Sequence, residues 1–307
     1  MRAIARPGPE SPGSPGSPGS RWGSGRWLWG LAGLVTAAVL GVPLAHVITG
    51  VEDPQNAYAR PQHVATRTET VPQPVTSLVV QSYGGRVQVA AGQVSRVQVT
   101  ETIMSDSGTT PAVMQSVSGG RLVLGDPACA NSGCTVDFSV IVPPGITVGA
   151  ATQGGPVTVS GVAGANLDSA GGPARATLIG GPLTVVTGGG PVLLRGVAGP
   201  LHADTAGGTL LAQDITAATA TITTGGGDAT VVFSAAPKSV KLSTDGGTAV
   251  LAVPGGPYAV TADSGGGPES LAIATDPAAR PTLTVSSGGG PLRIEPAPRL
   301  WRPGLSA

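Results

Sequence analysis

The chain has 307 residues, with 17 Lys or Arg and 17 Asp or Glu, so its formal net charge at pH 7 is zero. This balance gives no basic footprint for nucleic acid, and we expect no nucleic-acid partner. Gly (49) and Pro (29) make up about a quarter of the chain, which is typical of disorder unless a periodic pattern overrides it. Such a pattern starts near residue 76, so disorder is expected only before it.

The N-terminal region predicts a membrane anchor. Residues 1–26 are polar and rich in Pro, Gly and Ser, and we expect a disordered cytoplasmic tail there. Residues 27–51 have no formally charged side chain and are long enough for a helix to cross a bilayer core about 30 Å thick. Four arginines precede this stretch, whereas Glu52 and Asp53 follow it. Because positive residues stay inside, this predicts a single-pass transmembrane helix with everything after residue 51 outside the cell membrane.

The alternative is a cleaved signal peptide, because Ala57-Tyr58-Ala59 has the small-residue pattern of a cleavage site. The apolar stretch is longer than the usual h-region of about 7–15 residues, which favours an uncleaved anchor. Residues 52–75 are rich in Pro, Gln and Thr and have no apolar period, and they predict an extended extracytoplasmic linker.

The two cysteines of the chain are Cys129 and Cys134. Four residues separate them, whereas a thioredoxin-like dithiol has two. The three histidines lie far away in the sequence, and a metal site would need more ligands nearby, so we expect no metal. In an oxidising compartment the spacing predicts a small disulfide loop; two buried free thiols are the alternative.

From residue 76 to residue 296 the chain repeats a glycine-centred unit. The glycine clusters are 17 to 23 residues apart and begin at Gly154, Gly171, Gly188, Gly207, Gly225, Gly246, Gly265 and Gly288. Upstream, Gly84-Gly85 and Gly119-Gly120 follow the same pattern 35 residues apart. Self-similarity at a fixed period indicates a repeat architecture. Residues 297–307 are expected to form a C-terminal tail.

Each unit reads as two short strands joined by two sharp corners. Pairs such as Val157/Val159 and Leu292/Ile294 alternate with small or polar residues, which predicts strands with one buried face. Glycine suits corners that need positive φ, and we expect this at Gly226 and Gly266. One unit cannot bury its own apolar face, so the units must stack. The sequence therefore predicts an all-β, β-solenoid repeat domain; a propeller and a β-sandwich are the alternatives.

A charged N-terminus, one apolar span and then Gly-x-φ-x-φ strands separated by small-residue turns resemble the bacterial putative-adhesin repeat family. The resemblance covers roughly residues 76–295, with Gly-Gly-Pro where that family commonly has Gly followed by Asp or Asn. It implies an extracytoplasmic, β-solenoid-like fold without an established activity. It carries over no catalytic residues.

The sequence contains no convincing catalytic or cofactor-binding motif. Its glycine triplets lack the Gly-Lys-Ser/Thr of a P-loop, and no calcium-binding nonapeptide occurs. Asp168 and Asp204 both lie three residues before a Gly-Gly, two units apart, so a glycosidase-like pair about 10 Å apart is geometrically possible. Turn-forming aspartates are the simpler interpretation. His202 has no recognisable nucleophile partner.

We therefore expect a structural or binding role, adhesin-like, at the cell envelope, with no enzyme activity and no cofactor. Cell-wall polymer and an envelope protein are the partners considered. The alternatives are a sensing module for envelope stress or ligand and, less favoured, a polysaccharide-active β-helix enzyme.

Overall fold

The computed structural model describes residues 63–106, 110–131 and 133–298. The tail expected over 1–26, the transmembrane helix expected over 27–51 and the last nine residues lie outside these ranges. Within the described ranges, no helix has both the length and the apolar character needed to cross a membrane.

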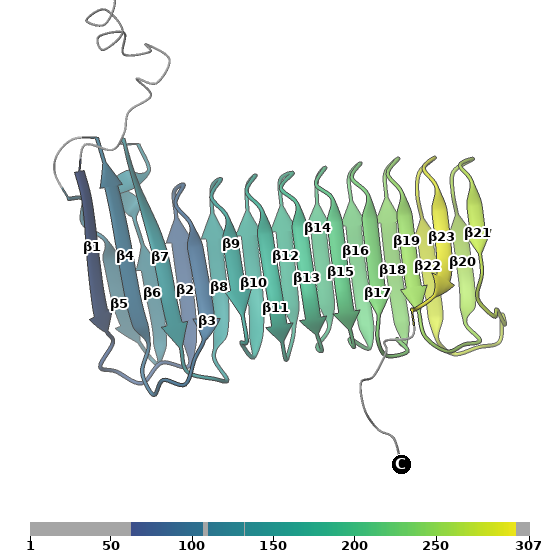
Figure 1. Ribbon diagram of the computed structural model, residues 1–307, viewed down its shortest axis with the longest axis horizontal. Helices are drawn as coiled ribbons and strands as arrows, with labels where there is room; N and C mark the ends of the chain where they lie inside the picture. Colours follow the sequence, from purple (N-terminus) through teal and green to yellow (C-terminus); the bar gives the residue numbers. More distant parts are fainter. Residues whose placement is uncertain (1–62, 107–109, 132, 299–307) are drawn as a thin grey trace, which may run out of the picture. The chain divides into compact units, whose positions relative to one another are not determined.

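The described residues form two long, mostly parallel β-sheets, whose strands stand side by side in two rows (Figure 1). In spatial order, sheet A consists of β1 (His63–Thr70), β4 (Gln98–Ser105), β7 (Cys134–Val142), β3 (Val87–Ala91), β9 (Val157–Ser160), β11 (Ala174–Ile179), β13 (Val192–Val197), β15 (Leu210–Ile215), β17 (Ala229–Phe233), β19 (Ala249–Val253), β23 (Leu292–Pro296) and β21 (Glu269–Leu271). Sheet B consists of β20 (Ala259–Asp263), β22 (Thr282–Ser286), β18 (Ser239–Thr244), β16 (Thr219–Thr224), β14 (Leu201–Thr205), β12 (Leu183–Thr187), β10 (Gly164–Ser169), β8 (Thr147–Thr152), β2 (Ser77–Ser82), β6 (Arg121–Gly125) and β5 (Met114–Ser118).

The repeating element is a coil made of one strand from each sheet. Coils pair in parallel and in phase, so that equivalent residues of successive coils are neighbours, as with Leu167, Val185 and Ala203 in sheet B. The inward-facing residues of both sheets are buried in one continuous hydrophobic cluster. Two continuous parallel sheets fit neither the separate blades of a propeller nor an antiparallel sandwich. The arrangement is consistent with a β-solenoid.

In nine of the described coils, one corner is built by a glycine that lies directly against a neighbouring coil. At these positions an added Cβ would lie 2.0 to 2.4 Å from a backbone carbonyl oxygen of the neighbouring coil, and the glycines are Gly85, Gly155, Gly172, Gly190, Gly208, Gly227, Gly247, Gly267 and Gly290. None of them has a strained positive φ. Positive φ occurs at the preceding glycine in several corners, including Gly226 (145°) and Gly266 (95°), as expected from the sequence.

A buried hydroxyl group precedes each of these glycines by three residues. The hydroxyls belong to Ser82, Thr152, Ser169, Thr187, Thr205, Thr224, Thr244, Ser264 and Ser287. Most of them donate a hydrogen bond to the carbonyl oxygen of their own corner glycine, for example Ser169 to Gly172 at 3.0 Å and Thr187 to Gly190 at 3.0 Å. Each bond satisfies a buried polar group inside an otherwise apolar core.

The N-terminal end departs from the predicted repeat. β1 occupies part of the linker expected over 52–75, because it pairs antiparallel with β4 along its whole length. Its side chains are mostly exposed, so backbone pairing rather than burial forms the strand, and hydropathy gives no signal for it. Gly119 and Gly120 form the turn of the antiparallel β5–β6 hairpin rather than a stacked corner.

At both ends the spatial order of the coils differs from the chain order. The β2–β3 coil lies between β6–β7 and β8–β9, although it precedes both in sequence. At the other end, the final β22–β23 coil is inserted between β18–β19 and β20–β21 (Figure 1). The inserted coil is the more apolar one, since Leu283, Val285 and Ile294 are buried, whereas every residue of β21 is exposed. The less apolar coil therefore forms the end of the stack.

The corner geometry predicts opposite effects for two adjacent glycines. Gly172→Ala would place a methyl group 2.2 Å from the carbonyl oxygen of Gly155, and we expect a loss of about 1–3 kcal/mol in unfolding free energy. Gly171→Ala meets nothing within 4 Å and should be neutral or stabilise by up to about 1 kcal/mol. Chemical denaturation of the full chain measures both. Equal denaturation midpoints for Gly172→Ala and Gly171→Ala would show that the corners of neighbouring coils do not stack closely.

Candidate functional site

The outer face of sheet B carries rows of polar side chains. The strand register aligns Asp168, Val186 and Asp204 in one row across β10, β12 and β14. Two strand spacings separate the two carboxylates by about 10 Å. The structure thus brings the aspartate pair to one face, but with an apolar side chain between the two residues. His202 lies in the neighbouring row, on the same strand as Asp204.

Metal-ligating side chains do not gather anywhere in the described ranges: no group of three or more His, Cys, Asp or Glu is placed to hold an ion. The acidic residues of sheet B's outer face occur singly along the rows. The carboxylates of this face are therefore spread along the rows and do not gather at one point among the described residues.

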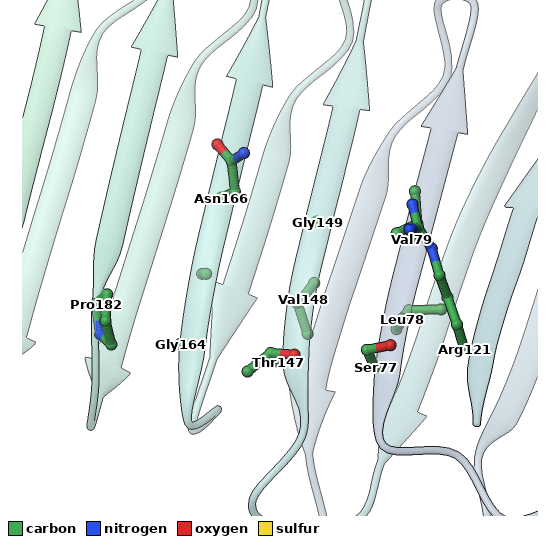
Figure 2. Close-up of a pocket in the computed structure, with 11 residues that line it drawn as sticks. Ser77, Leu78, Val79, Arg121, Thr147, Val148, Gly149, Gly164, Asn166 and Pro182 are labelled. Atoms are coloured by element: carbon green, nitrogen blue, oxygen red, sulfur yellow. The ribbon is translucent and has the colours of Figure 1, made fainter. Parts of the chain in front are cut away.

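Two cavities open on the outer face of sheet B, above strands β2, β8 and β10. The first, of about 370 Å³, lies at the start of β8 and has polar lining residues Ser77, Arg121, Thr147 and Asn166 (Figure 2). The second, of about 310 Å³, lies at the end of β8 and is lined by residues that include Gln81, Tyr83, Gln153 and Asp168. We call these two cavities, together with the outer face of β8 that runs from one to the other, the β8 trench.

A buried carboxylate holds one end of the β8 trench in place. Asp126 is 1% exposed and accepts hydrogen bonds from the backbone amide of Tyr83 at 3.0 Å and from the hydroxyl of Ser82 at 3.3 Å. Burial raises the pKa of Asp126, and these hydrogen bonds lower it in part. The corner that presents the Tyr83 ring is therefore tied to the sheet by a buried polar network.

The cysteines lie beside this network. Cys129 ends the short 3-10 helix η1 (Pro127–Cys129), and its amide donates to the carbonyl oxygen of Asp126 at 2.8 Å. Cys129 and Cys134 are joined by a disulfide with a Cα–Cα distance of 5.2 Å. The disulfide connects the segment that follows Asp126 to the first residue of β7.

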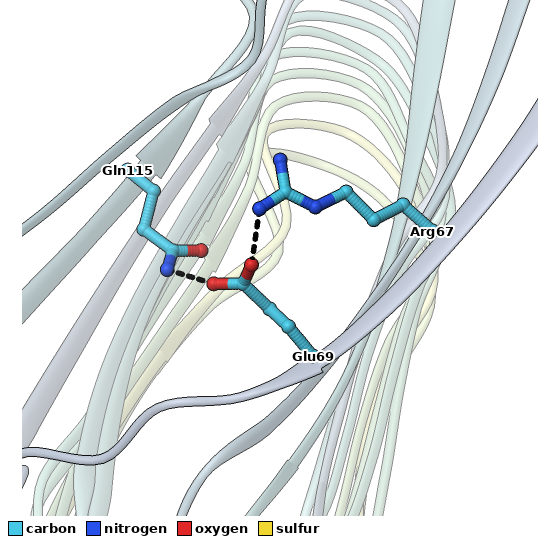
Figure 3. A network of polar contacts seen from close by, with 3 residues as sticks. All are labelled: Arg67, Glu69 and Gln115. Atoms are coloured by element: carbon cyan, nitrogen blue, oxygen red, sulfur yellow. Dashed lines mark hydrogen bonds and ion pairs between the residues drawn. The ribbon is translucent and has the colours of Figure 1, made fainter.

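A second polar cluster lies between the sheets at the N-terminal end. Arg67 and Glu69 form an ion pair at 2.5 Å, and the amide of Gln115 donates to the same Glu69 carboxylate (Figure 3). Glu101 of β4 lies opposite Arg67 in the register and is only 3% exposed. Its Oε2 atom has no hydrogen-bond partner among the described residues.

The environment of Glu101 raises its pKa. Burial is the main cause and the neighbouring Glu69 carboxylate adds to it, whereas the Arg67 guanidinium lowers the pKa. The folded chain therefore holds this proton more tightly than the unfolded chain does. The contribution of Glu101 to the free energy of unfolding is fully present below its ordinary pKa of 4.5, and it is lost as the pH rises through the raised pKa.

Glu101→Gln is expected to stabilise the full chain at neutral pH, because it keeps the shape of the side chain without a buried charge. The difference from the parent should shrink as the pH falls towards 4. Thermal melting across the pH range measures it, with the exposed Glu269→Gln as the control that should change little. A variant that is less stable than the parent at every pH would contradict this assignment.

Several residues of these clusters were not singled out by the sequence. Glu101 stands between Val99 and Ile103 at an inward-facing position of an alternating strand, and this pattern could have marked it as buried. Asp126 and Tyr83 gave no comparable signal, since they meet only when the β2 and β6 strands pair. The β8 trench likewise depends on three strands that are adjacent in space.

No family model and no curated protein matches this chain. Among solved structures, the structure of this chain is similar to the crystal structure of a putative adhesin from Bacteroides fragilis. The two sequences are 15% identical, the match covers 76% of this chain and 97% of the other, and the TM-score is 0.49. A putative adhesin from Parabacteroides distasonis has 13% identity, the same coverage and a TM-score of 0.44. A putative cell adhesion protein from Clostridium sporogenes has 9% identity, 76% and 100% coverage and a TM-score of 0.29.

Proposed function

We propose that the chain is a membrane-anchored, extracytoplasmic β-solenoid protein that binds a component of the cell envelope, in an adhesin-like role. The rows of polar side chains on sheet B carry this proposal. Successive outward positions in one row are Asn166, Thr184, His202, Thr221, Lys241, Thr284 and Thr261. An extended polymer or a protein surface can contact such a row at several points, whereas a single catalytic centre would need converging groups.

The anchor supports the envelope location in this proposal. Residues 27–51 have no formally charged side chain and follow four arginines, which supports the proposal that the two-sheet domain lies outside the membrane. Residues 52–62 then separate the anchor from β1.

The location has a direct test, because the only lysines are Lys238 and Lys241 and both are exposed. A membrane-impermeant amine reagent applied to intact cells should label these lysines and leave the N-terminal amine unlabelled, as read by mass spectrometry. Permeabilised cells provide the control, in which all three amines react. If only the N-terminal amine were labelled in intact cells, the topology would be the opposite of the one proposed.

The binding role predicts that the purified full chain in detergent cosediments with isolated bacterial cell envelope. A variant that retains only residues 1–62 is the control for partition of the anchor into envelope membrane, and the full chain should cosediment more than this variant does. Digesting the envelope beforehand with a protease or with a wall-degrading enzyme separates a protein partner from a polymer. Failure to cosediment with any of these preparations would refute the binding role.

A further inference from the structure

The β8 trench differs from the rest of sheet B's outer face. The outward positions of β8 are Thr147, Gly149 and Ala151, and the last two of these carry no side chain and a single methyl group, respectively. The register places Val79 and Gln81 of β2 on one side of them, and Asn166 and Asp168 of β10 on the other. The floor of the trench is therefore lower than both walls, and the two cavities lie along one line.

Polar groups of complementary kinds line the walls of the β8 trench. At the start of β8, Arg121 extends beside Val79 and provides guanidinium donors, and the Asn166 amide stands on the opposite wall (Figure 2). At the end of β8, the Asp168 carboxylate is a charged hydrogen-bond acceptor and Tyr83 is 40% exposed. Because buried Asp126 fixes the Tyr83 corner, this end is organised before any ligand arrives.

We propose that the β8 trench binds a linear glycan strand of the cell envelope, which rests on the binding role proposed above. Sugar hydroxyls both donate and accept hydrogen bonds, and so they can pair with amides, a guanidinium and a carboxylate within one trench. The faces of sugar rings are apolar, which suits the small floor residues and the Tyr83 ring.

The backbone of β8 favours a glycan over an extended peptide. β8 is hydrogen-bonded to β2 on one side and to β10 on the other. Peptides that bind sheets by strand addition need a free edge, and β8 has none. A glycan needs no backbone partner. The distance from Thr147 to Gln153 is about 20 Å, since a strand rises about 3.3 Å per residue, and this length accommodates several sugar rings.

The test uses peptide-free glycan strands, released from bacterial cell wall by an amidase, and the full chain in detergent. Asp168→Ala should weaken binding by about tenfold or more, because sugar hydroxyls lose a charged acceptor. Glu295→Ala is the matched control, since Glu295 is an exposed carboxylate of β23 in sheet A, away from the polar rows of sheet B and outside both cavities. It should bind like the parent.

A second variant blocks the β8 trench without removing a polar group. An added Cβ at Gly149 lies 3.6 Å from Val79 in ordinary contact, so Gly149→Val should fold and fill the floor. It should abolish binding while keeping the parent's melting temperature. Ala90→Val, at an outward position of β3 in sheet A, is its control and should bind normally.

The outcomes separate the two proposals. Equal binding by the parent, Asp168→Ala and Gly149→Val would overturn the trench as the glycan site, while the binding role would stand. Binding of the released stem peptides but not of the glycan strands would overturn the choice of ligand. A parent that binds neither glycan nor intact envelope would overturn the binding role itself.

Discussion

The close approach of backbones at the glycine corner is the constraint on which the stack depends. Coils pair at a strand spacing of about 4.8 Å, and at this corner the chain turns while it remains in contact with the coil beside it. A side chain at Gly190 would lie 2.0 Å from the carbonyl oxygen of Gly172, so the turn closes only without one. The neighbouring hydroxyl of Thr187 then bonds the carbonyl of Gly190, which keeps a buried polar group satisfied. The recurrence of the glycine clusters and the geometry of the corners are therefore consequences of one steric requirement.

Much of this architecture was predictable from two periodic patterns in the sequence, the alternation of apolar residues along each strand and the regular spacing of the glycine clusters. Alternation of Val, Leu and Ala marks the buried face, and the recurring glycine clusters mark the corners. The reason for the glycines was only partly predictable: positive φ is required at Gly226, but Gly227 is needed for close approach, which becomes visible only when a neighbouring coil is present. The disulfide spacing was readable from the sequence because it is local.

The spatial order of the C-terminal coils could not be predicted from the spacing of the repeats. β20 begins 20 residues after β18, the same separation that joins Thr219 to its partner Ser239, so direct stacking of β20 on β18 would continue the rhythm. The structure instead places β22 between them. The physical reason is burial, because an internal coil is covered on both sides and an end coil on only one. Leu283 and Val285 are therefore inside, and the coil with exposed Leu271 is at the end.

A repeated fold makes its coils alike, so a specific site has to come from a departure from the repeat. On the outer face of sheet B, most strands present Thr, Ser or a charged residue at the row positions, and the contacts they offer are similar from coil to coil. β8 departs from this rule, because its outward positions include Gly149 and Ala151. The neighbouring β2–β3 coil is out of chain order, and its Tyr83 backbone amide is hydrogen-bonded to Asp126. β6 forms an antiparallel hairpin with β5, but it pairs in parallel with β2 and so brings Arg121 and Asp126 beside β2. The irregular N-terminal end of the stack therefore also supplies the side chains that distinguish the β8 trench. Under the proposed binding role, the part of the described chain with the least regular sequence supplies the selective contacts, and the regular coils extend the polar rows along which a long partner would lie.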